Sequence, residues 1–200
     1  RMRLVEAEFE EETLFPIRGK SCSTNAMPHL ANEFKTFRDY ASASLERIYQ
    51  PERLKSAQRF EAITLESGML INDGKATFQF QPLPRAAQIA PGQGASLTDF
   101  DNDVHLDLYM LQNFYGPQHE TGRMDGGVSQ LLKGDGTGRF VPVSPAESGL
   151  VVPGDARALM VLDLNGDGKV DVVAAQNDGP VITFRNEGHR SAAEGRGEFP

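Results

Sequence analysis

The fold of this chain is decided by one stretch of alternating polar residues, Asp163-Leu164-Asn165-Gly166-Asp167-Gly168-Lys169-Val170-Asp171. Side chains that carry oxygen occupy positions 1, 3, 5 and 9 of the stretch, and a glycine occupies position 6. Glycine readily adopts the positive φ of a sharp turn, and alternate residues of a curled loop direct their oxygens inward. Calcium takes about six to eight oxygen ligands. Because residues 158–162 and 170–175 are typical of strands, we expect a metal loop inside a β-hairpin.

The same spacing occurs earlier in the chain, in the stretch Asp99-Phe100-Asp101-Asn102-Asp103-Val104-His105-Leu106-Asp107. A strand-like segment, 108–111, follows it. An EF-hand loop would carry a bidentate glutamate at position 12 and lie between helices. Position 12 is Met110 in the first loop and Ala174 in the second, and both loops have strand-like flanks. We therefore exclude an EF-hand.

Three hairpins with glycine-containing turns accompany the two loops. Residues 69–71 and 77–80 flank Asn72-Asp73-Gly74, and residues 128–132 and 140–143 flank a turn around Gly136. A third hairpin begins at 181–185 and reaches Asn186-Glu187-Gly188. The pair Gln-Asn also recurs, at 112–113 and 176–177, after the strand that follows each loop.

The repeating unit is therefore strand, metal loop, strand, longer connection and hairpin. Four antiparallel strands per repeat are typical of a β-propeller blade. We predict a mainly β chain with the end of one blade at 66–83, a complete blade at 92–148 and a partial blade at 154–188, followed by a polar tail at 189–200. Because a propeller needs about four or more blades, we expect the remaining blades in a longer parent chain.

The N-terminal segment, residues 1–65, lies outside the repeats. Strand-like stretches occur at 4–9 and 14–17, and 21–25 is typical of a loop. A helical insert is predicted near 31–60. Its inward stripe is Phe34, Phe37, Ala41, Leu45 and Ile48, and a second short helix starting at Pro51 would direct Leu54, Ala57 and Phe60 inward. The single cysteine, Cys22, has no recognisable catalytic base and is interpreted as a partly buried thiol.

Charge and composition argue against some classes of function and indicate where the protein acts. The 200 residues carry a net charge of −8, with 20 glycines and 12 prolines. Acidic loops account for much of that charge, and nothing resembles the basic patch of a nucleic-acid-binding protein. No apolar run is long enough to cross a membrane. Weak calcium sites fill at extracellular calcium concentrations, so we expect an extracellular, cell-surface or periplasmic protein.

Two stretches resemble the FG-GAP repeat, also called the VCBS repeat, of integrin α-like propellers. They are the second loop with the following Val172-Val173-Ala174, and the downstream Phe184-Arg185-Asn186-Glu187-Gly188. The resemblance covers about residues 66–188. It implies a seven-bladed calcium-binding propeller that acts in adhesion or recognition. It also implies about two Ca²⁺ ions. Their side-chain ligands would be Asp99, Asp101, Asp103 and Asp107 in the first loop and Asp163, Asn165, Asp167 and Asp171 in the second, with His105 and Lys169 contributing backbone carbonyls.

One departure from the repeat and two alternative interpretations remain. Val104 stands where the repeat has glycine, so the first loop is expected to bend differently or to bind more weakly. An Asx-rich turn without metal is the other interpretation of both loops. For function, we expect a noncatalytic module that binds a protein or carbohydrate. The alternative is part of an exported lyase or hydrolase that uses His119, Tyr115 and Arg123 with Glu120 or Asp125, all in the connection 113–125.

Overall fold

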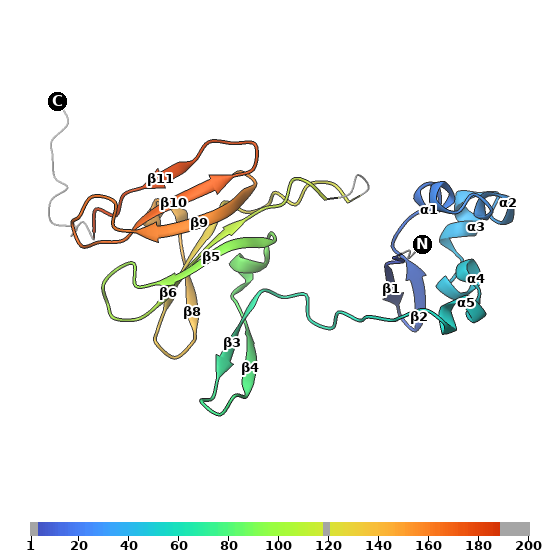
Figure 1. Ribbon diagram of the computed structural model, residues 1–200, viewed down its shortest axis with the longest axis horizontal. Helices are drawn as coiled ribbons and strands as arrows, with labels where there is room; N and C mark the ends of the chain where they lie inside the picture. Colours follow the sequence, from blue (N-terminus) through green and yellow to red (C-terminus); the bar gives the residue numbers. More distant parts are fainter. Residues whose placement is uncertain (1–3, 118–120, 189–200) are drawn as a thin grey trace. The chain divides into compact units, whose positions relative to one another are not determined.

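A computed structural model describes residues 4–117 and 121–188. Within these residues the chain is mainly β, with eleven strands in four small antiparallel sheets and a few short helices (Figure 1). The chain divides into two compact units, Arg1–Ile63 and Thr64–Pro200, which are described separately. Every helix in the described ranges is too short to cross a bilayer.

The first unit combines one hairpin with short helices. Strands β1 (Ala7–Glu10) and β2 (Thr13–Pro16) pair antiparallel. The helices are α1 (Lys20–Ala26), α2 (Leu30–Glu33), α3 (Phe37–Ala41), α4 (Leu45–Tyr49) and α5 (Pro51–Lys55). Their buried core consists of Leu30, Phe34, Tyr40, Ala43 and Ile48.

Several sequence-based expectations for this unit were wrong. The apolar stripe predicted one helix, but Thr36 and Ser44 cap two separate helices, α3 and α4. The Thr36 hydroxyl accepts the Asp39 N–H at 3.0 Å, and the Asp39 carboxylate accepts the Thr36 N–H at 3.2 Å. This capping box satisfies amides that a continuous helix would have bonded internally, and it leaves Phe37 exposed.

The boundaries of the helical region also differ from the prediction. Residues 21–25, expected in a loop, belong to α1. The second short helix does begin at Pro51, as predicted, but it ends at Lys55. Phe60 therefore lies beyond the helix and is 80% exposed instead of packed inward, and Ala57 is exposed as well.

The second unit contains three antiparallel sheets. A hairpin, β3 (Gly68–Asn72) and β4 (Phe78–Pro82), is followed by the short 3-10 helix η1 (Arg85–Gln88). The four-stranded sheet contains, in spatial and sequence order, β5 (Gly92–Thr98), β6 (Asp107–Gln112), β7 (Gln130–Gly134) and β8 (Phe140–Val143). After α6 (Pro145–Ser148) comes the three-stranded sheet of β9 (Ala156–Leu162), β10 (Asp171–Gln176) and β11 (Ile182–Phe184).

These sheets confirm a mainly β, antiparallel chain with hairpins at the predicted turns around Gly74 and Gly136. The strand predicted at 181–185 is present as β11, but it pairs with β10 across a turn at 177–181, and no described strand follows the turn predicted at Asn186-Glu187-Gly188. The described strands form open sheets and no closed ring. Each predicted metal loop connects the first two strands of a sheet, from β5 to β6 and from β9 to β10. The assignment of these sheets to propeller blades stays a proposal.

Strand β6 is the centre of the unit because both of its faces are buried. Tyr109 and Leu111 face a core shared with the three-stranded sheet, where Val172 and Ala174 of β10 contribute. Leu108 and Met110 face the opposite core, which includes Leu83, Ala87 and Leu132. Side chains alternate across a strand, so one strand holds two sheet interfaces together. The position of both loops therefore depends on these cores.

Candidate metal centre

The two predicted metal loops have the same backbone bend. Positive φ angles occur at positions 4 and 6 of each loop: 61° and 76° at Asn102 and Val104, and 76° and 81° at Gly166 and Gly168. The expectation that Val104 would bend the first loop differently was wrong. A β-branched residue here adopts the left-handed conformation that glycine adopts in the second loop, which costs conformational energy.

The aspartate at position 1 organises the turn in both loops. One Asp99 carboxylate oxygen accepts the Asp103 N–H at 3.1 Å, and the other accepts the Val104 N–H at 2.9 Å. Asp163 accepts the corresponding N–H groups of Asp167 and Gly168 at 3.2 and 2.9 Å. The carboxylate thus sits inside the curl, as expected of a loop that surrounds a cation.

The aspartate at position 9 joins three segments of its sheet. Asp107 and Asp171 are buried at the first positions of β6 and β10. Asp107 accepts the Phe100 N–H at 3.0 Å and the Gly134 N–H, at the end of β7, at 3.0 Å. Asp171 accepts the Leu164 N–H at 3.0 Å and the Asn186 N–H, after β11, at 2.8 Å. The two loops therefore share a hydrogen-bond pattern at corresponding positions.

The first loop brings several carboxylates together. Oxygens of Asp99, Asp101 and Asp107 lie within 4.8 Å of one another. Lys133 of β7 reaches into this loop, where its ammonium group contacts Asp101 and lies 2.9 Å from an Asp103 oxygen. A cation is thus already held beside the carboxylates, and Asp101 and Asp103 keep about 30% of their side-chain surface exposed.

The second loop holds its polar groups differently. Asn165 donates its side-chain amide to Asp167 at 2.9 Å and accepts the Asp167 N–H at 3.0 Å. In the three-stranded sheet the residue that corresponds to Lys133 is Arg185. Lys133 directly precedes Gly134, and Arg185 directly precedes Asn186, the residues whose N–H groups bond to the buried aspartates. Arg185 is exposed and forms no ion pair within the described part of the chain. Lys169 donates from its side chain to the Glu187 carbonyl at 3.1 Å.

Hydrogen bonds to these carboxylates shift their pKa values. Backbone donation, chiefly from Gly168, lowers the pKa of Asp163, and the Asn165 amide lowers the pKa of Asp167. Lys133 lowers the pKa of Asp103. The pKa of Lys133 is in turn raised, mainly by its hydrogen bond to Asp101. These groups stay ionised at neutral pH, so both loops present negative charge to a cation.

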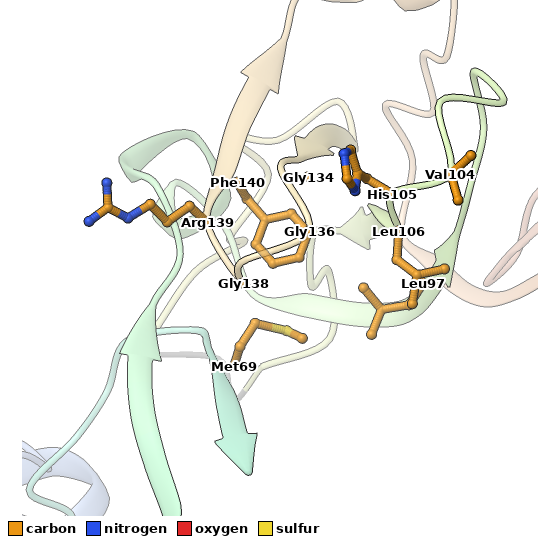
Figure 2. A pocket seen from close by; sticks show the side chains of 10 residues that line it. All are labelled: Met69, Leu97, Val104, His105, Leu106, Gly134, Gly136, Gly138, Arg139 and Phe140. Atoms are coloured by element: carbon orange, nitrogen blue, oxygen red, sulfur yellow. The ribbon is translucent and has the colours of Figure 1, made fainter. Parts of the chain in front are cut away.

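The His105 side chain is one of the groups that line a hollow beside the first loop (Figure 2). It packs against the turn that follows β7, where a Cβ on Gly136 would lie 2.5 Å from His105 Nδ1. With Val104, Leu106 and Phe140 it lines a hollow of about 370 Å³. This placement is compatible with a role for the His105 backbone carbonyl alone, as the resemblance implies.

The two loops border a common cleft of about 1020 Å³ between the four-stranded and three-stranded sheets. Asn186 spans it: its backbone N–H bonds to Asp171, and its side-chain amide donates to the Phe100 carbonyl at 3.0 Å. Phe100 is also the residue whose N–H bonds to Asp107. A short chain of hydrogen bonds therefore connects the buried aspartates of the two loops.

The connection 113–125 provides the residues of the enzyme alternative. His119 and Glu120 lie outside the described residues. The Arg123 guanidinium stacks over the Tyr115 ring at 4.8 Å, and the Tyr115 hydroxyl donates to the Pro153 carbonyl at 2.9 Å. Asn113, fully buried, donates to the carbonyls of Gly127, Pro153 and Gly154. These contacts fix the ends of the connection to the segments that precede β7 and β9.

Sequence reasoning missed three residues at the loops: Lys133, Gly134 and Asn186. A side chain at Gly134 would collide with the backbone of Leu106, and Asn186 occupies the corresponding position of the next sheet. Alignment of the hairpins 131–136 and 183–188 would have placed Lys133 beside Arg185 and Gly134 beside Asn186. The sequence repeat therefore identifies these positions as equivalent in the two sheets, but it does not predict which side chains they contact.

The residues present fit calcium chemically. The side chains that face the two curls offer only oxygen ligands, which suits a hard cation, and in the first loop an ammonium group already lies among them. Sequence comparisons add no family assignment: no protein-family model matches the chain, and no curated protein matches it.

Proposed function

We propose that this chain is a calcium-binding repeat module of the FG-GAP type, in which Ca²⁺ stabilises the loops of propeller blades. The observation that carries the proposal is the shared loop geometry. Two stretches with the same spacing of oxygen-bearing residues adopt the same positive-φ bend and the same bonds to the aspartates at positions 1 and 9. A metal-free Asx turn explains the backbone bonds. In the first loop Lys133 offsets part of the repulsion among the carboxylates, whereas no ion pair in the described residues does so in the second loop.

In this proposal calcium acts mechanically. Each loop joins two adjacent strands, and its last aspartate also bonds the end of the third strand. An ion bound to Asp171 and Asp163 would link the start of β10 to the end of β9. Binding to the folded state alone then adds its free energy to folding.

The wider role is recognition of a protein or carbohydrate by an exported, noncatalytic module. Support for it comes from the repeat resemblance and the acidic charge. The connection 113–125 lends no specific support to the enzyme alternative, because Tyr115 and Arg123 contact each other and the chain nearby.

A thermal melt in EGTA and in millimolar calcium tests the calcium function. At free calcium about 100 times Kd, one site adds about 2.7 kcal/mol. We expect calcium to raise Tm, and Asp163→Ala to lose part of that rise. Titration calorimetry should find about two sites in the unaltered chain.

Asp73→Ala is the matched control. Asp73 accepts backbone N–H groups of Lys75 and Thr77 at 2.7 and 3.2 Å in an ordinary hairpin turn. Its loss should lower Tm equally in both buffers. A calcium increment that is zero in the unaltered chain, or is unchanged by Asp163→Ala, would refute the proposed role of the second loop.

A further inference from the structure

We propose that Lys133 is an internal counter-ion of the first loop that competes with calcium, so that the second loop fills first. This inference rests on the proposed calcium function and concerns the regulation of the first site. It is carried by the position of one ammonium group, which the corresponding hairpin of the next sheet does not reproduce.

Lys133 lies on β7, which pairs with β6, the strand that begins at the buried Asp107. From there its side chain spans to the loop and contacts both Asp101 and Asp103, at positions 3 and 5. These are two of the side chains that would hold the ion. Calcium carries two positive charges into a space beside this ammonium group, and like charges at short distance repel strongly. Binding therefore requires Lys133 to leave its two carboxylates.

The displacement is feasible because Lys133 is half-exposed, with 48% of its side-chain surface in solvent. Its ammonium can swing into water without leaving an unpaired buried charge. Exposed ion pairs are individually weak, so Lys133 reduces calcium affinity without abolishing it. In the absence of calcium the same contacts relieve repulsion among the loop carboxylates and hold the loop folded.

The second loop has no such competitor. Arg185 occupies the position that corresponds to Lys133, but no ion pair joins it to Asp163, Asp167 or Asp171 in the described part of the chain. The lysine at position 7, Lys169, turns to the Glu187 carbonyl. The two loops share the same bend, and the first has one carboxylate more, Asp101 where the second has Asn165. The competing ammonium is the feature that lowers the calcium affinity of the first loop below that of the second.

The test is calorimetric titration of Ca²⁺ into metal-free protein carrying Asp163→Ala. This substitution removes a ligand of the second loop, so the titration measures calcium binding to the first loop. Adding Lys133→Met should raise the calcium affinity of that loop on the order of tenfold. Lys133→Gln, which keeps a polar side chain, provides a second neutral variant and should act in the same direction. Arg185→Met is the matched control and should leave the affinity unchanged.

A second readout needs no metal. In EGTA, Lys133→Met should lower Tm because the carboxylates lose their counter-ion, whereas Arg185→Met should not. An unchanged affinity in both Lys133 variants, with calcium still binding, would overturn the counter-ion role and leave the calcium function standing. No calcium binding at either loop in the unaltered chain would overturn the inference together with the function on which it rests.

Discussion

Replacement of Val104 by glycine should stabilise the chain, with or without calcium. Val104 has a φ of 76°, a left-handed conformation that costs an L-residue about 1–2 kcal/mol. Glycine removes this strain but loses about 0.5–1 kcal/mol through its greater freedom in the unfolded chain. The Val104 side chain is 89% exposed, so its removal gives up little buried surface. The expected gain is therefore about 1 kcal/mol.

The assay is urea unfolding in EGTA, followed by circular dichroism. With a slope of about 2 kcal/mol per molar urea, the midpoint should rise by about 0.5 M, and Tm by about 2–4 °C. Gly168→Val is the reciprocal variant: it introduces the same strain at a φ of 81° and should lower stability by a similar amount. If Val104→Gly leaves the midpoint unchanged or lowers it, the left-handed bend does not limit the stability of the first loop.

Two further predictions concern the buried asparagine and acid stability. Asn113→Ala should cost about 3 kcal/mol or more in urea unfolding, because four hydrogen bonds are lost; Asn177→Ala, which removes one 3.3 Å bond to Asp155, should cost clearly less. The lowered pKa of Asp163 predicts stability that is fully present above the unfolded pKa of about 4 and is lost as pH falls through the lower folded pKa. In metal-free buffer the Tm difference between unaltered chain and Asp163→Ala should therefore shrink below about pH 4, and a constant difference would contradict this assignment.

The strands and hairpins of the second unit were predictable because their signals are local. Glycine at Gly74 and Gly136 marks turns with positive φ, and alternating side chains mark the strands. The helices of the first unit were predicted less well because the apolar stripe from Phe34 to Ile48 crosses two helix starts. Thr36 with Asp39 forms a capping box that the sequence does contain. The capping box decides where α3 begins because it bonds the backbone amides at that point. The apolar stripe only specifies which side of a helix is apolar, and it does not specify where the helix starts.

The contacts around the candidate site were less predictable because they join distant parts of the chain. Lys133 and Asp101 are 32 residues apart, and Asn186 and Phe100 are 86 apart. Spacing within a loop predicts which oxygens converge, since nine consecutive residues share one backbone curve. It does not predict which side chain of another strand enters the curve. That choice depends on strand register, and in an antiparallel sheet a shift of one residue moves a side chain to the opposite face.

The aspartate at position 9 explains why each loop and the hairpin after it form one structural unit. Asp107 and Asp171 each accept one N–H from position 2 of their own loop and one from the end of the third strand or the residues just after it. Both carboxylates are buried, and a buried charge without partners would be strongly destabilising. The third strand must therefore reach the loop even without metal. An ion that binds the loop stabilises an arrangement already built into the sheet, so calcium should raise the stability of the second unit without creating its fold.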